Sequence, residues 1–522
     1  MTATSRPCWL AFSVALVATF IAVGCLRSEP VITIANNTAG ELSAEESAAD
    51  AILRNGPIFE DWPKPDVAIV FSGELDGYLE PCGCAGLENQ KGGLKRRHTF
   101  LQQLESEGWP VVSLDMGGQI RRVGPQSEIK YRYALQGLID LGYSTIGLGA
   151  RELQLDSSVL IYVLSNFDPT VNPVASANVV VLDPDLGLTS RYRIVEVGGK
   201  KIGVTSVLGN KHEALLQNTD DIHWTEPDAA LREVLPKLKN EQCDLLVLMV
   251  HADPEEATAL AKEFPEFQIV ATTGGAEEPP HRADNIDGLR TQLIEVGHKG
   301  MYAVVLGIYN DPQQPFRYQR VPLDHRFQDS PDMHKLMADY QTELKDMGLD
   351  GLGSTEMKHP TDSFVGTETC AECHTEAAAI FENTGHSHAT KTLVDLEPQR
   401  HYDPECLSCH VTGWNPQEYF PYASGYMGLK KTPHLTDNGC ENCHGPGASH
   451  VAAEQGEVSV DDAEIESRRA AMRMKLLDNE GNKEGQKLGT VVENCMQCHD
   501  LDNSPEFDFQ KYWPKVEHYG KD

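Results

Sequence analysis

The stretch Cys370-Ala-Glu-Cys373-His374 is the first of four copies of Cys-x-x-Cys-His that lie between residues 370 and 499. The other three are Cys406-Leu-Ser-Cys409-His410, Cys440-Glu-Asn-Cys443-His444 and Cys495-Met-Gln-Cys498-His499. In each copy, two thiols match the two vinyl groups of one porphyrin, and the following histidine can bind the iron. A zinc ribbon also uses paired Cys-x-x-Cys, but zinc does not require a histidine after every second cysteine. The pattern therefore predicts four covalently bound c-type haems, with proximal ligands His374, His410, His444 and His499.

A sixth ligand for each iron has to come from outside these motifs. Residues 362–522 contain six further histidines, which are His386, His388, His401, His434, His450 and His518. They are numerous enough for bis-histidine ligation of most of the irons. A haem with two axial histidines has no position for a substrate, so it transfers electrons. A single five-coordinate haem with a polar pocket would instead allow reduction of a small inorganic molecule.

Residues 1–24 are predicted to form an export signal. Arg6 precedes an apolar run from Trp9 to Val23, which is too short to span a bilayer comfortably. The run ends in Ala22-Val23-Gly24-Cys25, which resembles the lipobox of bacterial lipoproteins and implies attachment of diacylglycerol to the sulfur of Cys25. Plain secretion is the alternative. We expect an exported protein on the periplasmic side, anchored to a membrane surface by lipid.

Cysteine usage agrees with export, since covalent attachment of haem needs an exported chain. Eight of the 13 cysteines belong to the motifs, and only Cys82, Cys84 and Cys243 lie outside both the motifs and the signal region. This is too few for a disulfide scaffold. Cys243 precedes an apolar strand and is predicted to be a small buried hydrophobe. Cys82 and Cys84 could share a metal, pair with Cys243 or remain thiols.

Length and composition predict several domains. A chain of 522 residues exceeds one ordinary core, and its net charge of −34 argues against nucleic acid and favours basic redox partner proteins. Polar residues at 25–66 predict a flexible tether. We expect an α/β domain at 67–325, a linker helix at 326–361 and a motif-bearing domain at 362–522.

Between residues 67 and 311, short β-branched runs alternate with stretches of helical periodicity. The predicted strands are Val67–Phe71, Val111–Leu114, Tyr192–Val197, Ile202–Val207, Leu245–Val250, Ile269–Thr272 and Tyr302–Tyr309. The predicted helices are Leu94–Glu105, Tyr131–Leu141, Ala229–Leu238 and Pro254–Phe264, followed by a polar helix at Asp332–Met347. This alternation predicts an α/β sheet domain with its own core. Few strand-like runs follow residue 364, so the second domain is expected to be mainly α and loop-rich.

The α/β part resembles the metallophosphoesterase domain of the 5′-nucleotidase family. The residues that carry the resemblance are Ser72-Gly73-Glu74-Leu75-Asp76-Gly77, Leu114-Asp115-Met116-Gly117-Gly118, Leu148-Gly149-Ala150-Arg151-Glu152 and Val250-His251. The resemblance implies an α/β sandwich that, in the family, binds two metal ions and hydrolyses phosphate esters.

Most of the metal ligands that the resemblance implies are replaced in this chain. Glu74 and Asp76 stand for the first aspartate and histidine, and Gly118 stands for the bridging aspartate. Ala150 and Arg151 replace an Asn-His pair, residues 272–276 contain no histidine, and only His251 is unchanged. We therefore expect a degenerate site and a retained scaffold. The alternative is a hydrolase with an unusual metal set of Glu74, Asp76 and His251.

The motif-bearing half resembles the cytochrome c-554 family of tetrahaem cytochromes. The resemblance rests on the motifs and on Phe364–Cys370, Asp403-Pro404-Glu405-Cys406, Asn438-Gly439-Cys440, Cys443–Gly447 and the tail Phe507–His518. It implies that His450, in the loop after His444, serves a neighbouring haem. Among the other candidate distal ligands, His386 or His388 ranks next, and His434 and His518 follow.

These observations predict an exported, lipid-anchored tetrahaem cytochrome that transfers electrons at a membrane surface. Its α/β domain is expected to be a degenerate phosphoesterase fold that serves for docking or positioning. Two alternatives come from other classes: a multihaem reductase of a small nitrogen or sulfur oxyanion, and a metal-dependent phosphoesterase.

Overall fold

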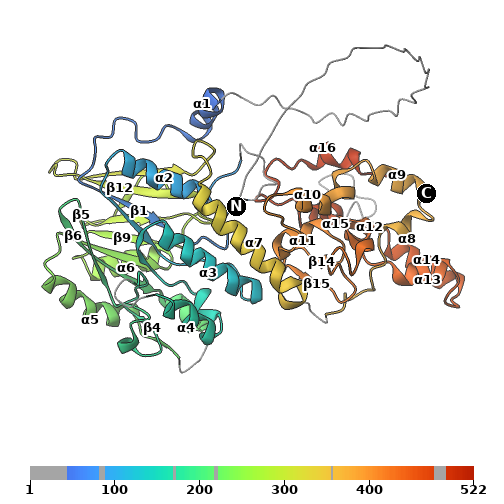
Figure 1. The fold of residues 1–522 in the computed structure, drawn as a ribbon, viewed down its shortest axis with the longest axis horizontal. Helices are drawn as coiled ribbons and strands as arrows, with labels where there is room; N and C mark the ends of the chain where they lie inside the picture. The colour runs from blue at the N-terminus through green and yellow to red at the C-terminus, as the bar shows by residue number, and fades with distance from the viewer. Residues whose placement is uncertain are drawn as a thin grey trace, which may run out of the picture.

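The chain forms an α/β sandwich followed by a mainly helical, loop-rich region, as the sequence predicts. A computed structural model describes residues 44–81, 89–167, 172–216, 221–353, 357–474 and 489–521. Figure 1 shows the α/β part, here called the N-terminal domain (residues 44–353), beside the C-terminal region (residues 357–521). Cys25, Cys82 and Cys84 lie outside the described residues.

Two sheets form the N-terminal domain. The first has the order β13-β12-β1-β2-β3, and the second has the order β10-β11-β9-β8-β6-β5. The strands of the first are β1 Val67–Ser72, β2 Val111–Asp115, β3 Tyr143–Ile146, β12 Tyr302–Ile308 and β13 Phe316–Pro322. Those of the second are β5 Arg193–Val197, β6 Lys200–Leu208, β8 Leu245–His251, β9 Ile269–Thr272, β10 Asp284–Asn285 and β11 Gln292–Glu295. β1 pairs with β2 in parallel and with β12 antiparallel, so the first sheet is mixed.

The side-chain period of two along β1 explains the layering. Val67, Ile69 and Phe71 belong to a core between the two sheets, whereas Ala68 and Val70 face the helical layer. Both sets are fully buried because both faces of the sheet are covered. One layer is formed by α2 Leu94–Ser106, α3 Pro125–Asp140 and α7 Pro331–Gly351, and α5 Pro227–Asn240 and α6 Pro254–Glu263 cover the second sheet. Smaller elements are α4 Ser157–Ser165 and the pair β4 Val179–Val181 and β7 Ile222–Trp224.

The predicted linker helix is part of the N-terminal domain. α7 packs against α2 and α3, and it lies across the front of the domain toward the C-terminal region in Figure 1. Met333, Met337 and Leu344 on its apolar face are buried in the same core as the first sheet. A helix that buries this much apolar surface is a structural layer. The helix predicted within 326–361 is confirmed, but it is a layer of the N-terminal domain and not a separate linker.

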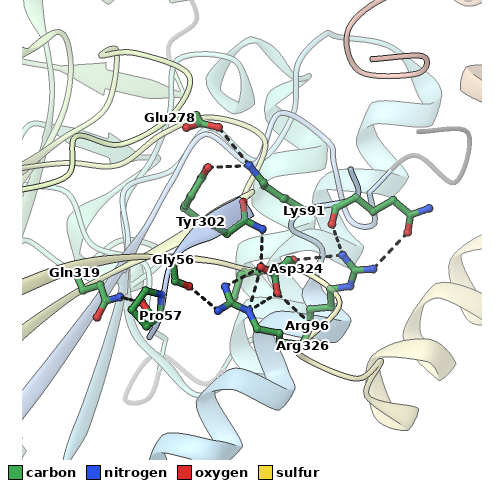
Figure 2. A network of polar contacts seen from close by, with 12 residues as sticks. Gly56, Pro57, Lys91, Arg96, Glu278, Tyr302, Gln319, Asp324 and Arg326 are labelled. Carbon is green, nitrogen blue, oxygen red and sulfur yellow. Dashed lines mark hydrogen bonds and ion pairs between the residues drawn. The ribbon is translucent and has the colours of Figure 1, made fainter. Parts of the chain in front are cut away.

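The predicted tether is also partly wrong. Residues 44–55 form helix α1, and the segment after it is bound to the N-terminal domain (Figure 2). Asn55 Nδ2 donates to Asp324 Oδ2 at 2.8 Å. Arg326 donates to the same carboxylate and also to the Gly56 carbonyl at 2.8 Å. Phe59 lies 4.9 Å from the ring of Trp109. Polar composition alone predicts disorder, whereas these polar groups have hydrogen-bond partners in the domain that keep the segment ordered.

The C-terminal region consists of short helices and loops around a small apolar core. Its helices are α8 Thr367–Ala371, α9 Thr375–Phe381, α10 Ala389–Asp395, α11 Pro404–His410, α12 Cys440–His444, α13 Ala448–Glu454, α14 Asp462–Ala471, α15 Gly489–Cys495 and α16 Phe509–Tyr512. A two-stranded ribbon joins β14 Trp414–Asn415 to β15 Phe420–Pro421. Within the described ranges, no helix combines the length and apolar character that crossing a bilayer requires.

Candidate functional site

The second, third and fourth Cys-x-x-Cys-His motifs open onto one large cavity of about 1680 Å³. Its lining includes motif residues of the C-terminal region, namely Cys406, Cys409, His410, Cys443, His444, Cys495, Cys498 and His499. The N-terminal domain contributes Tyr78, Glu80, Lys130 and Tyr340 to the same walls. The cavity is therefore shared between the two parts of the chain.

Three motif histidines face a second histidine. The ring centroids of His374 and His450 are 6.4 Å apart, those of His499 and His386 are 6.0 Å apart, and those of His444 and His518 are 5.7 Å apart. Two imidazole nitrogens bonded at about 2 Å to opposite sides of one metal ion place their ring centroids about 6 Å apart. Each of the three pairs is therefore spaced so that its two imidazoles could hold one iron. The candidates that they use are His450, His386 and His518.

Three of the motif histidines have their imidazole rings oriented by a contact at Nδ1. His410 Nδ1 lies 2.7 Å from the Ala389 carbonyl oxygen, and His444 Nδ1 lies 2.7 Å from the Met472 carbonyl oxygen. His499 Nδ1 lies 2.9 Å from Ser504 Oγ. A carbonyl oxygen can only accept, so it requires the proton on Nδ1 and leaves the Nε2 lone pair free for a metal. Such partners fix the tautomer and angle of ligating histidines.

The other histidine candidates have different surroundings. His388 is exposed, and its Nδ1 lies 3.0 Å from Ser387 Oγ. His401 packs against the ring of Tyr402 at 4.1 Å. His434 lies in a short 3₁₀ turn, Pro433–Leu435, with its backbone against Gly366. The sequence alone could not separate His386 from His388, because two residues on one turn differ only in the direction that each side chain takes.

Motifs that are distant in sequence lie in contact. The thiols of Cys370 and Cys440 lie within reach of each other, and so do the thiols of Cys409 and Cys498. The first motif therefore lies beside the third, and the second beside the fourth. Groups attached at these cysteines would be close neighbours.

The second motif is held by the N-terminal domain through the start of α11. Asp403 caps the helix by accepting from the backbone N–H of Glu405 at 3.1 Å. Gln126 of α3 and Gln341 of α7 each donate a 2.8 Å hydrogen bond to the Asp403 carboxylate. Lys130 of α3 forms an ion pair with Glu405 at 2.6 Å. Three side chains of the N-terminal domain thus fix the helix that carries Cys406, Cys409 and His410.

The position of the lost bridging aspartate is sterically closed. Gly118 has a φ of +83°, and a Cβ at this position would lie 2.9 Å from Cα of Glu74. The buried carboxylate of Glu152 accepts from the backbone N–H of Gly118 at 2.7 Å. Arg151, at a lost histidine position, is exposed and donates to Gln154 at 3.3 Å. His251 is buried, and burial lowers its pKa to about 3.

A histidine that the sequence analysis missed lies between the two acidic residues of this site. His298 Nδ1 is 3.2 Å from Glu74 Oε2 and 3.5 Å from Asp76 Oδ2, and its Nε2 is 3.4 Å from the Gly275 carbonyl oxygen. Hydrogen bonding to Asp76 and the charge of Glu74 raise the pKa of His298 to about 9. The imidazolium therefore supplies positive charge between carboxylates that a metal ion would otherwise balance. In the part of the chain that the structure describes, no three His, Cys, Asp or Glu side chains are arranged so that they could hold a metal ion together.

This pairing predicts a pH-dependent contribution to stability. The folded-state pKa of His298 exceeds its ordinary 6.5, so its protonation favours the folded protein. The contribution is fully present below pH 6.5 and is lost as the pH rises through about 9. We expect the stability difference between wild type and His298→Gln to be largest near pH 6 and to shrink toward zero above about pH 9. Urea unfolding across this range measures it, and a difference that does not vary with pH would contradict the assignment.

Known proteins resemble both halves of the chain. The family model described as cytochrome c554 and c-prime matches residues 369–445. A cytochrome c-554 from Nitrosomonas europaea is 34% identical over 97 residues, which is 16% of this chain and 39% of that protein. A 5′-nucleotidase from Rattus norvegicus is 23% identical over 236 residues, which is 43% of this chain and 39% of that protein. This chain thus covers well under half of each of these relatives.

Among solved structures, a 5′-nucleotidase precursor from Thermus thermophilus is 17% identical, with a TM-score of 0.46, and the alignment covers 58% of this chain and 62% of that one. The family-model match includes the first three Cys-x-x-Cys-His motifs. The nucleotidase match supports the resemblance found for the N-terminal domain. The C-terminal region therefore resembles the cytochrome c-554 family, and the N-terminal domain resembles the 5′-nucleotidase family.

Proposed function

We propose that the protein is an exported tetrahaem c-type cytochrome that carries electrons between redox partner proteins. The observation that carries this proposal is the set of three histidine pairs with ring centroids 5.7 to 6.4 Å apart, each containing one motif histidine. Haem held in this way is six-coordinate and exchanges electrons without binding a substrate. The contacts between Cys370 and Cys440 and between Cys409 and Cys498 support close spacing of the haems.

In this proposal each haem has a defined set of protein ligands. His450 would complete the haem of His374, His386 that of His499, and His518 that of His444. His410 is the proximal ligand of the haem attached at Cys406 and Cys409. The bound haems supply the redox chemistry, and the protein fixes the imidazole angles through the Nδ1 contacts of His410, His444 and His499.

The N-terminal domain would act as a scaffold in this proposal. Tyr78, Glu80, Lys130 and Tyr340 form part of the cavity wall, so removing the domain would open the cavity to solvent. Solvent exposure and charge are among the factors that set haem potentials. The domain would thus shape the surroundings of the haems without hydrolytic activity of its own.

The haem count is tested on the full-length protein expressed with haem-attachment machinery. A pyridine haemochrome assay with protein quantitation should give four haems per chain, and peptide mass spectrometry should locate them at the four motifs. Dithionite should reduce all of them and air should reoxidise them. A count of three or fewer, or zinc in place of iron, would reject the proposal.

A phosphoesterase is the second candidate, because the curated 5′-nucleotidase matches this domain. Gly118, Ala150 and Arg151 stand at three ligand positions and offer no metal-binding atoms of the required kind, so we expect no stoichiometric manganese or zinc in the N-terminal domain. Metal analysis after incubation with each ion, together with hydrolysis of 5′-nucleotides, provides the measurement. Bound metal and hydrolysis that are both lost in His251→Ala would establish the hydrolase.

We also propose that the protein is anchored to a membrane through lipid at Cys25, on the strength of the Ala22–Cys25 sequence. Two or more acyl chains hold a protein far more firmly than one. The Cys25→Ser variant should move from the membrane fraction to the soluble fraction and lose incorporated palmitate. Unchanged fractionation of that variant would contradict anchoring at this residue.

A further inference from the structure

Asp502 connects the N-terminal domain to the fourth motif. It lies three residues after His499, and its Oδ2 accepts a 2.7 Å hydrogen bond from the hydroxyl of Tyr78. Its Oδ1 forms an ion pair with Lys299. The side chains of Lys299 and Asp502 are 20% and 21% exposed, so solvent screens this pair only in part.

On the C-terminal side, Asp502 belongs to a tight loop that reaches the ring of His499. Asp500 Oδ1 accepts from the backbone N–H of Asp502 at 3.0 Å and of Asn503 at 2.8 Å. The backbone N–H of Ser504 donates to the Asp500 carbonyl at 2.8 Å, and Ser504 Oγ lies 2.9 Å from His499 Nδ1. Displacement of Asp502 therefore displaces Ser504 and the hydrogen bond that orients the imidazole.

On the N-terminal side, the two residues that bind Asp502, Tyr78 and Lys299, are held by the loop that carries Glu74 and Asp76. Glu74 and Asp76 have φ angles of +45° and +53°, in the left-handed region that non-glycine residues adopt only when neighbouring contacts hold them. The backbone N–H of Lys299 donates to the Glu74 carbonyl at 2.7 Å, and His298 bridges the Glu74 and Asp76 carboxylates. The backbone segments that carry Tyr78 and Lys299 are therefore fixed relative to each other.

We propose that Tyr78 and Lys299 are positioning residues for the haem held by His499. This inference rests on the proposed function, in which His499 binds an iron. Tyr78 and Lys299 bind the Asp502 carboxylate. The 500–504 loop in turn orients the His499 ring through Ser504. Lys299 also neutralises the charge of Asp502 near the haem. Loss of Lys299 leaves a negative charge that favours the ferric state, so the potential of this haem falls.

The test compares Tyr78→Phe, Lys299→Met and the double variant with wild type, all loaded with haem. Electron paramagnetic resonance and a spectroelectrochemical titration report the g values and potentials of the individual haems. We expect one low-spin signal to change its g values, and its potential to shift downward in Lys299→Met, while the other signals stay as in wild type. Lys299→Arg should return the potential most of the way, because it keeps the charge.

The matched control is Lys201→Met. Lys201 forms an ion pair with Glu241 at 3.1 Å and donates to the Glu241 carbonyl at 2.7 Å, both within the N-terminal domain, so its loss should leave every haem signal unchanged. Selective loss of haem from Cys495 and Cys498 in Lys299→Met, located by peptide mass spectrometry, would equally support the proposal. A double variant with four unaltered signals and potentials would overturn it. Wild-type protein without haem at Cys495 and Cys498 would defeat the proposed function instead, before any variant is compared.

Discussion

Replacing His386 with alanine is expected to convert one haem from a six-coordinate low-spin form to a five-coordinate high-spin form that binds carbon monoxide. The ring of His386 lies 6.0 Å from that of His499, so its removal opens one axial position while the thioether bonds keep the haem in place. Low-temperature electron paramagnetic resonance should lose one low-spin signal and gain a high-spin signal. The reduced protein should gain carbon monoxide binding of about one equivalent per chain, since one iron loses one ligand.

His388→Ala is the matched control, because His388 lies two residues away on the same turn, is exposed and has Ser387 Oγ as its Nδ1 neighbour. Its spectra should match those of wild type. If His388→Ala produced the high-spin signal and His386→Ala did not, the ligand pair would be misassigned. If neither variant changed the spectra, His499 would have another partner.

Asp403→Ala is expected to destabilise the protein by roughly 3 kcal/mol, from a lost helix cap of about 1 kcal/mol and two amide groups left without an acceptor at about 1 kcal/mol each. Asp403 and Gln341 are only 5% and 3% exposed, so water cannot easily replace the lost carboxylate. The start of α11 would lose its hydrogen bonds to Gln126 of α3 and Gln341 of α7 and keep only the ion pair of Lys130 with Glu405. Urea unfolding of the haem-loaded protein, followed by far-UV circular dichroism, measures the change.

Asp395→Ala provides the control for removal of an aspartate. Asp395 is 59% exposed, and its one ion pair among the described residues is with Lys391, four residues earlier. Its loss should therefore lower the free energy of unfolding by less than about 0.5 kcal/mol. Equal effects of the two substitutions would show that Asp403 does not connect the two parts of the chain. Asp403→Asn should fall between them, because its amide oxygen keeps one of the acceptors.

The sheet architecture could be predicted from sequence where strands are buried on both faces. Runs such as Val67–Phe71 and Leu245–Val250 are continuously apolar, which is the pattern of strands covered on both sides, and β1 and β8 confirm them. β13, Phe316–Pro322, was missed because it is only partly buried and carries Arg317, Gln319 and Arg320. It follows β12 after residues 309–315 and pairs with it as an antiparallel hairpin, so a hairpin pattern in the sequence was the signal that could have found it.

The candidate site was predictable where chemistry dictates spacing and unpredictable where it depends on packing. A Cys-x-x-Cys-His motif contains its own proximal histidine, because one porphyrin sets the spacing of the two thiols and the imidazole. The second histidine of each pair is 76 residues from its partner for His374 and His450, and 113 residues away for His386 and His499. No local rule connects them, because the fold alone brings them together. His298 was missed for the same reason: it lies more than 200 residues from Glu74.

The ligation state of the haems in the oxidised wild-type protein distinguishes an electron carrier from a reductase. Electron paramagnetic resonance with near-infrared magnetic circular dichroism distinguishes bis-histidine low-spin haem from high-spin haem and counts each form. Low-spin bis-histidine signals for at least the three haems of His374, His444 and His499 are the result predicted from the ring pairs at 5.7 to 6.4 Å. Two or more high-spin haems would contradict the account and favour a reductase that binds its substrate at iron.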